Sequence, residues 1–433
     1  MIPEIENTAF VVNLNNGNVN NNNQNNNNYV RAVSDCLHET NDTIDLVSLY
    51  AGYLDCRRGK TRTLVASEFE VEQEHQLIEL LEEITYRTYV PMPAKAFVIT
   101  KPDYREIFAS AFRDRVVQHW MRLYLEPMLE ERLIPSVFSC RKEKGTFAAQ
   151  QHVAQMIYAT SEGYTRDCWV MKLDLKGFYM SIDRQRVTRK AQHFVGNSNP
   201  ALCYLLDVML NRAPENNCIR CGDVSLWQHL PPHKSLFTCG EGKGLTIGDV
   251  LVQHIANLLL DPIDHYISET LHLGYARYVD DMILVGDNKE YMLSCVPLIR
   301  QALKVEAGLT LHPRKFYLQH YTKGVKFVGG VIKRGRTYIS NRTVNNAFAC
   351  VRRFNAIRSD KVRRQRSEKM VASINSYLGI MRHHASYKIR QRLIASIDDA
   401  WHRYITISDD LTTISSKHNR RQQIRRLIKT KKI

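Results

Sequence analysis

No run of 18 apolar residues occurs in the chain, so no segment is expected to span a membrane. The first residues include acids at Glu4 and Glu6 and have no basic stretch ahead of an apolar run, which argues against a secretory signal. Without either feature, a cytoplasmic protein is expected.

Cysteine is sparse. The ten Cys residues are scattered without a disulfide framework, which fits a reducing compartment. Cys218 and Cys221 have CxxC spacing, and Cys239, His229 and His233 follow nearby. A structural zinc site usually needs a second close pair, and only single candidates are present. An insertion loop with incidental thiols is the favoured interpretation, and a zinc site is the alternative.

Acidic residues are outnumbered by basic ones. The chain has 60 Lys and Arg against 44 Asp and Glu, for a net charge of +16 and a pI near 9.3. Such an excess predicts a polyanionic partner, with nucleic acid as the first candidate. The alternative, a protein bound to a membrane surface, would need an amphipathic lysine-rich helix or a lipidation signal, and neither is seen.

Apolar periodicity indicates how the chain is organised. Residues 45–90 and 106–133 are expected to be helical, with a strand at 96–100 between them. Across 166–335, short β-type runs alternate with helical stretches, which favours an α+β core around an antiparallel sheet. The helical stretches there are expected at 248–270 and 289–306.

The C-terminal part has a different pattern. From about residue 340 the strand patterns stop, and the sequence is helical and strongly basic through 352–369 and 417–433. The last of these runs holds eight Lys or Arg and no acid. Each run could be a solvated helix face. Two of them on a basic chain favour contact with nucleic acid instead.

Three carboxylates stand out. Asp280 and Asp281 fall between strand-like YAR and apolar MILVG, so a hairpin would place them side by side at its tip. Adjacent carboxylates are costly unless a cation neutralises them. Asp174 ends another strand-like run, in which it shares a face with Lys172. Three carboxylates at adjacent strand ends can hold two Mg²⁺ ions about 3.5–4 Å apart, and Mn²⁺ is a potential substitute.

These motifs resemble those of reverse transcriptases over roughly residues 45–400. YVDD at 278–281 matches the catalytic motif of that family, and LDLKGFYMSID at 173–183 is similar to its first palm motif. The resemblance implies a right-hand polymerase fold of α+β class that binds template RNA, cDNA or primer, and dNTPs. It implies four parts: 1–44, a flexible N-terminal segment; 45–165, an N-terminal and fingers region; 166–335, a palm with an insertion at about 185–245; 336–433, a basic helical thumb and tail.

The resemblance also implies roles for single residues. Asp174, Asp280 and Asp281 match the metal ligands, and Leu175 would offer its carbonyl oxygen. Lys315 lies in HPRKFYL at 312–318, which resembles a loop whose Lys protonates the leaving pyrophosphate.

Other residues match those that bind the incoming nucleotide. Arg105 corresponds to a residue that grips the triphosphate. Tyr179 falls at the steric gate against ribonucleotides, with a core aromatic as the alternative. Ile247, Gly248 and Gln253 in GLTIGDVLVQ complete this group.

A final set matches residues near the template and primer. They lie in two fingers motifs, KPDYREIFASAFRDRVVQH and PSVFSCRKEKGTFAA, and in the primer-grip hairpin VKFVGG. The residues are Arg113, for which a structural role is the alternative, Arg141, Lys144, Gly145, Phe327 and Gly329.

The segment at 244–253 separates classes within the family. Most reverse transcriptases have QGxxxSP there, whereas enzymes of diversity-generating retroelements resemble [I/V/L]GxxxSQ. Ile247, Gly248 and Gln253 match the second pattern, and Val252 departs from it, because the class has Ser there. Losing a polar side chain near the nucleotide should weaken selectivity. In that class, error-prone copying of template adenines and a small oligomeric accessory protein are expected.

Residues 13–28 contain twelve Asn in sixteen positions. The segment could be a disordered leader of low complexity. Alternatively, VVNLNNGNVNNNNQNNNNYVRAV at 11–33 resembles the end of a retroelement target gene, whose adenine-rich template repeat would overlap this reading frame.

Two rival interpretations stay open. One is a reverse transcriptase of another class, such as a defence or abortive-infection enzyme or one like those of group II introns. The other is a degenerate, non-catalytic fold that serves as an RNA-binding scaffold.

Overall fold

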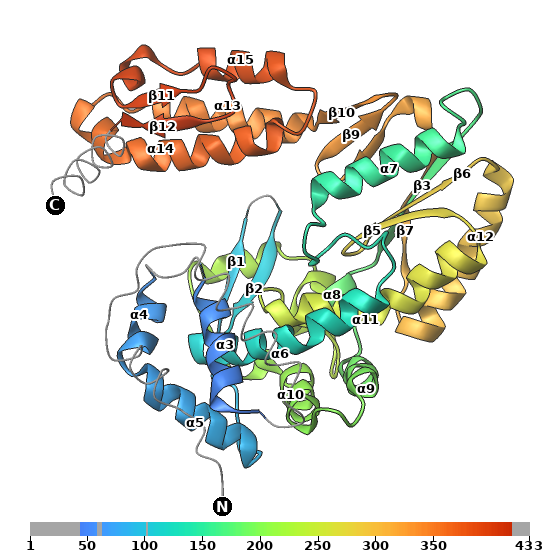
Figure 1. Ribbon diagram of the computed structural model, residues 1–433, viewed down its shortest axis with the longest axis vertical. Coiled ribbons are helices and arrows are strands. Elements are labelled where there is room, and N and C mark those ends of the chain that lie inside the picture. The colour runs from blue at the N-terminus through green and yellow to red at the C-terminus, as the bar shows by residue number, and fades with distance from the viewer. Residues whose placement is uncertain (1–43, 59–62, 101–102, 418–433) are drawn as a thin grey trace, which may run out of the picture.

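A computed structural model describes residues 44–58, 63–100 and 103–417 (Figure 1). The Asn-rich tract at 13–28 lies outside these residues, as does nearly all of the basic run at 417–433. Among the described residues, no helix combines the length and apolar character needed to cross a membrane.

The N-terminal region is helical, as the sequence predicts. It contains α3 (Leu46–Arg57), α4 (Leu64–Val71) and α5 (Gln73–Thr85). A reciprocal capping box between Asp45 and Ser48 begins α3. This helix packs on α6 (Phe112–Arg132) at close range, because a Cβ at Gly52 would lie 2.8 Å from the Cβ of Trp120.

A small sheet follows, in the order β2-β1-β4. The predicted strand at 96–100 is confirmed as β1 (Ala94–Ile99), which pairs antiparallel with β2 (Arg105–Ala109) and parallel with β4 (Cys218–Arg220). The prediction of helix from residue 106 is wrong for its first residues. There burial alternates along Arg105–Ala109, as a half-buried strand requires, and the helix starts only at Phe112.

The antiparallel core sheet is confirmed, with strand order β5-β6-β3-β7. Its strands are β3 (Trp169–Leu175), β5 (Gly274–Tyr278), β6 (Asp281–Gly286) and β7 (Leu311–His320). Residues 312–318 were expected to form a loop, and the structure makes them part of β7. Pro313 is tolerated in this edge strand because it lies between Leu311 and Phe316, where the register with β3 shifts and the ladder is already interrupted.

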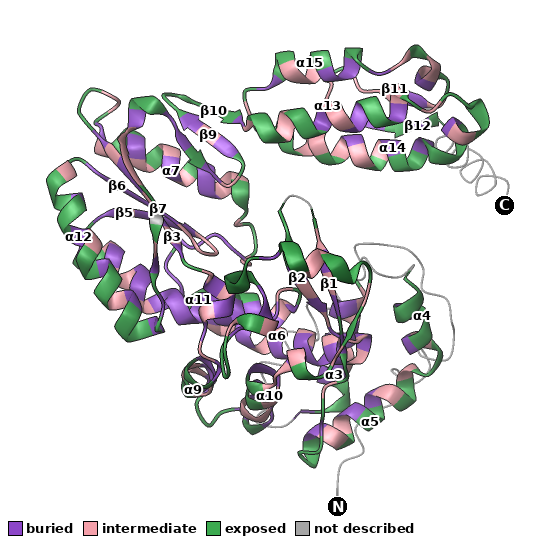
Figure 2. Ribbon diagram, turned by 180° about the vertical axis from the view of Figure 1, so that it is seen from behind, coloured by how far each residue is buried: buried purple, intermediate pink, exposed green. Residues whose placement is uncertain are grey.

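Different elements cover the two faces of this sheet. On one face, Met171, Leu173 and Leu175 join the main core with α11 (Val250–His265) and α12 (Lys289–Ala302). Twelve of the sixteen residues of α11 are buried (Figure 2). On the other face, Val170 packs against α7 (Thr146–Thr160) and the strands that follow β7. Lys172 and Asp174 lie on this second face, beyond the covered part, and are only partly buried.

The predicted helices at 248–270 and 289–306 are confirmed. A π-helical turn extends α11 through Tyr266–Thr270 and another extends α12 through Leu303–Ala307. The helices between β3 and α11 are α8 (Phe178–Ser181), α9 (Arg184–Val195) and α10 (Pro200–Asn211), followed by short 3-10 turns at Pro214–Asn216, Val224–His229, Pro232–Lys234 and Leu236–Thr238.

The C-terminal part begins with a three-stranded sheet and ends in a helical unit with its own core. The sheet contains β8 (Val325–Phe327), β9 (Gly330–Lys333) and β10 (Arg336–Ile339), and the unit contains α13 (Asn341–Asn355), α14 (Asp360–Met381) and α15 (Tyr387–Ala395). The expectation that strands stop near residue 340 is wrong, because β11 (Ile405–Ile407) and β12 (Ile414–Ser416) form a hairpin against α14. At three residues each, these strands are too short to show a pattern in the sequence.

Candidate active site

The turn between β5 and β6 presents two adjacent carboxylates, as the sequence predicts. Tyr278 pairs with Asp281, so Val279 and Asp280 form the two-residue turn of a tight hairpin. Val279 has φ of 58°, a left-handed conformation that is unusual for a β-branched residue. Such strain is found mostly where the surrounding structure holds a functional group in place.

Asp174 lies next to this turn because of the strand register. Leu173 on β3 pairs with Met282 on β6, so Asp174 and Asp281 stand one residue beyond the last paired position. On the other side of β3, Leu173 pairs with Phe316 of β7. The three predicted carboxylates therefore lie at one end of the central sheet, with β7 alongside.

Two lysines neutralise this cluster. Lys315 Nζ lies 3.0 Å from Asp174 Oδ2, and Lys172 Nζ lies 2.8 Å from Asp281 Oδ1. Lys172 had no role in the prediction, although its place on the same strand face as Asp174 was a signal. What the sequence could not show is the diagonal contact across to β6, which depends on the register.

Asp280, like the other two acids, is partly buried. Burial, together with the charges of Asp281 and Asp174, raises the pKa of Asp280 to about 6, while its own backbone N–H and Lys315 act in the opposite direction. Burial is the largest cause of this rise, and the like charges of Asp281 and Asp174 add to it. A site of this kind favours a cation.

The donor set suits Mg²⁺, which prefers carboxylate and carbonyl oxygens. Within the described residues, no three His, Cys, Asp or Glu side chains stand close enough together to hold a metal as they are. In this arrangement Lys172 and Lys315 serve as counter-ions, so a bound cation would compete with them for Asp281 and Asp174. Leu175 is buried in the core and could contribute only its backbone oxygen.

The predicted gate, Tyr179, lies in α8 beside the acids. Burial raises the pKa of Tyr179, and the charges of Asp280 and Arg105 also act on its hydroxyl. Its ring also packs against the main core, so the alternative of a core aromatic describes part of its role. Arg105 itself is exposed at the start of β2.

The segment containing Ile247 and Gly248 is hydrogen-bonded to α8 on one side and to β2 on the other. Leu245 N donates to Tyr179 O at 3.0 Å, and Phe108 N donates to Ile247 O at 3.0 Å. Gly248 has φ of +136°, and a Cβ there would lie 2.6 Å from Phe108 O. Only glycine fits this position.

Gln253 is exposed at the N-terminal end of α11, and its side-chain oxygen accepts a hydrogen bond from the Cys140 thiol. This contact links α11 to the segment that precedes α7. Burial raises the pKa of the Cys140 thiol to about 11.

Two of the residues predicted to bind template or primer are occupied elsewhere. Arg113 pairs with Glu83 and covers the ring of Tyr89, contacts that fit the alternative of a structural role, and its template contact stays a prediction. Arg141 makes a forked pair with Glu130 at 2.7 and 2.8 Å and also donates to backbone carbonyls. These contacts give Arg141 a structural role, and its template contact stays a prediction.

The other four residues predicted to lie near the template and primer have different surroundings. Lys144 donates to Pro135 O and lies over the Phe138 ring. Gly145 is the N-cap of α7. Phe327 is 1% exposed and belongs to the core, so its predicted primer contact could involve only the backbone. Gly329, at φ of +86°, is open to added atoms.

The thiols of the candidate zinc site contact backbone oxygens. Cys218 Sγ lies 3.8 Å from Glu215 O, and Cys221 Sγ lies 3.5 Å from Ile219 O. The following segment is tied to β2 by buried Glu106, which accepts hydrogen bonds from the side chains of Trp227 and Ser235, each at 2.7 Å. The insertion therefore packs onto the small sheet.

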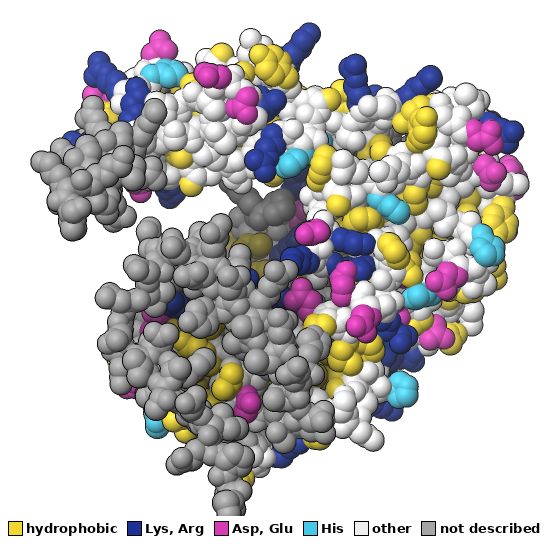
Figure 3. Space-filling view, in the orientation of Figure 1, with side chains coloured by type: hydrophobic (Ala, Val, Ile, Leu, Met, Phe, Trp, Pro, Cys, Tyr) yellow, Lys and Arg dark blue, Asp and Glu magenta, His cyan; other side chains and the backbone are white. Residues whose placement is uncertain are grey.

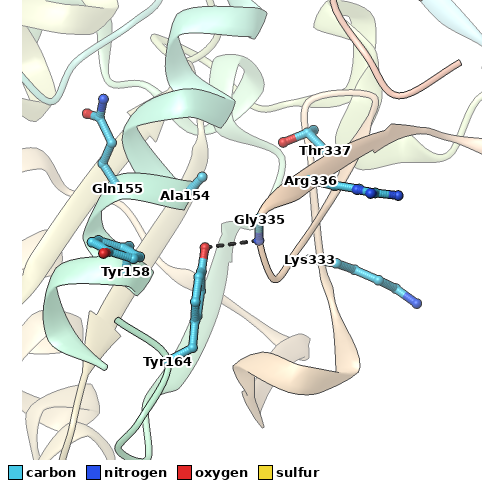
Figure 4. A pocket seen from close by; sticks show the side chains of 8 residues that line it. All are labelled: Ala154, Gln155, Tyr158, Tyr164, Lys333, Gly335, Arg336 and Thr337. Carbon is cyan, nitrogen blue, oxygen red and sulfur yellow. Dashed lines mark hydrogen bonds between the residues drawn. The ribbon is translucent and has the colours of Figure 1, made fainter. Parts of the chain in front are cut away.

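The surface of the described residues is hollowed in more than one place. The space-filling view shows an open gap beneath the C-terminal helical unit, with Lys and Arg side chains near its inner end (Figure 3). A separate recess of about 330 Å³ lies between α7 and the β9–β10 hairpin. There the Tyr164 hydroxyl accepts from Gly335 N, while Lys333 and Arg336 point away from Tyr158 (Figure 4). That recess is distant from the carboxylates, at the opposite end of β3.

Comparison with known proteins identifies a family for this chain. Residues 99–332, more than half of the chain and including all three acids, match the reverse transcriptase (RNA-dependent DNA polymerase) family. The chain is 21% identical to protein YkfC of Escherichia coli (strain K12) over 314 residues, which cover 64% of this chain and 76% of YkfC.

Solved telomerase structures are also similar. Apo telomerase from Candida tropicalis gives a TM-score of 0.46 at 11% identity, covering 70% of this chain and 55% of the telomerase chain. Telomerase from Candida albicans with a TWJ fragment of telomeric RNA gives 0.42 at 11% identity, covering 71% and 54%. This chain thus spans little more than half of either telomerase chain. By its family match, the chain belongs to the reverse transcriptases.

Proposed function

We propose that the protein is an RNA-directed DNA polymerase that extends a primer with dNTPs on an RNA template. The observation that carries the proposal is the placement of Asp174, Asp280 and Asp281 at one end of the central sheet, with a lysine counter-ion on Asp174 and another on Asp281. The basic charge of the chain suits a nucleic-acid partner.

Asp174, Asp280, Asp281 and the carbonyl oxygen of Leu175 would hold Mg²⁺, or Mn²⁺ in its place. Bound divalent ions would activate the primer hydroxyl and stabilise charge on the leaving pyrophosphate. Once its carboxylate binds metal, Lys315 is free to donate a proton to the pyrophosphate.

The neighbouring side chains select and hold the nucleotide. Tyr179, in contact with the core, would exclude a ribose 2′-hydroxyl by its bulk. Exposed Arg105 would bind the triphosphate, because a guanidinium makes forked contacts with phosphate oxygens. Ile247, Gly248 and Gln253 would form the floor of the same pocket.

Primer extension on an RNA template with Mg²⁺ tests the activity. Asp280→Asn should slow extension by at least about a hundredfold, because a ligand and its charge are lost. Asp183→Asn is the matched control: Asp183 is also in the palm, but its side chain caps α9 at Arg186 N. Undiminished DNA synthesis by Asp280→Asn would refute the proposal.

Within the family, we place the enzyme in the diversity-generating class. Support comes from Ile247, Gly248 and Gln253, and from the Asn-rich tract. An apolar Ile beside the nucleotide removes a polar contact that could enforce selectivity. We expect misincorporation mainly opposite template adenine, with a structured template RNA and a small accessory protein as partners.

Fidelity measurements separate this class from the others. Ile247→Gln should lower misincorporation opposite adenine while leaving it unchanged opposite the other bases. Equal error rates at all four bases in the parent enzyme would exclude the diversity-generating class but not the polymerase activity.

The Asn-rich segment gives a separate test. The DNA around the gene should hold a near-copy of the segment that encodes 11–33, differing mainly at adenines. Deleting residues 1–33 should not reduce primer extension.

A further inference from the structure

Arg277 is a fully buried cation next to the catalytic turn. It lies in β5, two residues before Val279, and is 0% exposed. Its guanidinium makes a forked pair with Asp264, also 0% exposed, through Nε–Oδ1 at 2.7 Å and Nη2–Oδ2 at 2.6 Å. The hydroxyl of Tyr275 donates to the same carboxylate at 2.7 Å.

Stability alone does not account for this pair. Removing two charges from water costs about as much as their attraction returns, so apolar side chains of similar volume would stabilise the core equally well. The fork between Arg277 and Asp264 does fix the plane of the guanidinium, and this directs its remaining nitrogen, Nη1, to one place.

That nitrogen contacts the turn itself. Arg277 Nη1 donates to Val279 O at 3.0 Å and to Asn257 Oδ1 at 3.0 Å. The Val279 carbonyl belongs to the peptide group that carries the N–H of Asp280. Holding this oxygen therefore fixes the peptide plane on which Asp280 is mounted, and it does so where Val279 has its strained φ of 58°.

The same arginine connects the turn to the segment before α7. Its backbone exchanges hydrogen bonds with that segment, from Arg277 N to Ser136 O and from Phe138 N to Arg277 O, each at 2.9 Å. Asn257 on α11 binds Ser139 through both its side-chain atoms, at 2.9 and 3.1 Å. The catalytic turn, the segment before α7 and α11 thus meet at one arginine, the first and last through its guanidinium and the second through its backbone.

We propose that Arg277, oriented by Asp264, is a positioning residue that holds Val279 in its left-handed conformation and so sets Asp280 and Asp281 against Asp174. This inference rests on the proposed polymerase function. A displacement of a reacting group by about 1 Å can cost about a hundredfold in rate, so the effect of losing this anchor should be on the chemical step.

Arg277→Lys tests the role, because lysine keeps the charge and cannot bind Asp264, Asn257 and Val279 O together. We expect kcat to fall by about tenfold or more while the primer–template Kd and the KM for dNTP change less than about threefold. Arg122→Lys is the matched control, since Arg122 also pairs with a buried acid, Asp55, in the N-terminal helical region. It should lower the melting temperature and leave kcat unchanged.

A second substitution separates positioning from a general packing effect. Asn adopts the left-handed conformation more readily than Val. Val279→Asn in the Arg277→Lys background should therefore recover part of the lost kcat. Hydrogen exchange of the backbone at 278–281 gives a readout independent of activity: it should be faster in Arg277→Lys and slower again in the double variant.

The outcomes are distinct. Unchanged kcat in Arg277→Lys would overturn the positioning role. A double variant in which neither kcat nor slow hydrogen exchange recovers would overturn it as well. If Arg277→Lys does not fold, Asn257→Ala removes one partner of Nη1 without leaving a charge unpaired. It should lower kcat by several-fold, and unchanged kcat would again overturn the role. A parent protein without primer extension would instead refute the polymerase proposal.

Discussion

Lys315 of β7 and Asp174 of β3 form an ion pair across two neighbouring strands, with 3.0 Å between Nζ and Oδ2. The candidate general acid is thus bound to a candidate metal ligand. The side chain of Lys315 is 61% exposed, so releasing it from Asp174 is inexpensive.

Replacing Lys315 with Ala should reduce kcat for nucleotide addition by about a hundredfold, the usual effect of losing a general acid. The affinity for primer–template should change little, because the lysine faces a carboxylate. Single-turnover extension with saturating dNTP measures the step. A variant with unchanged kcat would show that pyrophosphate leaves without a proton from this residue.

Lys172→Met addresses the second ion pair. Without Lys172, Asp281 has no counter-ion, and its repulsion with Asp280 should lower the melting temperature of the metal-free protein. Because Mg²⁺ no longer competes with a lysine, the rise in melting temperature on adding Mg²⁺ should be larger than in the parent.

Lys289→Met is the control for this measurement. Lys289 contacts the ring of Trp169 at the other end of β3 and is not paired with a site carboxylate. Its Mg²⁺ response should equal that of the parent. If Lys172→Met responded to Mg²⁺ no more than Lys289→Met, Lys172 would not be the counter-ion that metal displaces.

These lysines show where sequence reasoning ends. The hairpin bearing Asp280 was predictable because apolar runs flank two adjacent acids, and Asp174 because it ends an alternating strand. The contact between Lys172 and Asp281 was not, because it depends on how β3 pairs with β6. Nor was β7, since its sequence is polar and contains Pro313.

The partners of the arginine side chains could not be predicted from the sequence either. Arg141 lies in a basic motif that suits template contact, but its guanidinium fits Glu130, eleven residues earlier, and two backbone carbonyls. Whether Arg141 can reach Glu130 depends on the path of the chain between these two residues. Charge in a sequence therefore predicts nucleic-acid binding for the whole protein better than for a particular side chain.

Gly248→Ala should disrupt the nucleotide pocket. The new Cβ would lie 2.6 Å from Phe108 O, and φ of +136° is unfavourable for alanine. We expect a loss of about 2–4 kcal/mol in the free energy of unfolding, or a displaced segment with raised KM for dNTP.

Gly145→Ala is its control. That glycine has φ of −138°, and nothing lies within 4 Å of an added Cβ. Its free energy of unfolding should stay within about 1 kcal/mol of the parent. Equal behaviour of the two alanine variants, in urea unfolding and in dNTP titration, would mean that the backbone at 248 can relax freely.

Asp55 gives a test of stability against pH. Burial by itself would raise the pKa of Asp55, but hydrogen bonds and charge from His119 and Arg122 outweigh it and lower the pKa to about 2. Because the folded pKa lies below that of an unfolded Asp, near 3.9, the carboxylate stabilises the fold above that pH. The contribution is about 2–3 kcal/mol and is lost as pH falls from about 4 towards 2.

Asp55→Asn should therefore be less stable than the parent by about that amount at pH 7, and the difference should narrow at pH 3. Urea unfolding of both proteins at each pH measures it. Asp103→Asn removes an exposed pair with Arg342, in which both side chains are 55% exposed, and should cost less than about 1 kcal/mol. A gap between Asp55→Asn and the parent that stayed constant from pH 7 to pH 3 would mean that the loss comes from packing around Arg122, since only an ionising group makes the gap depend on proton concentration.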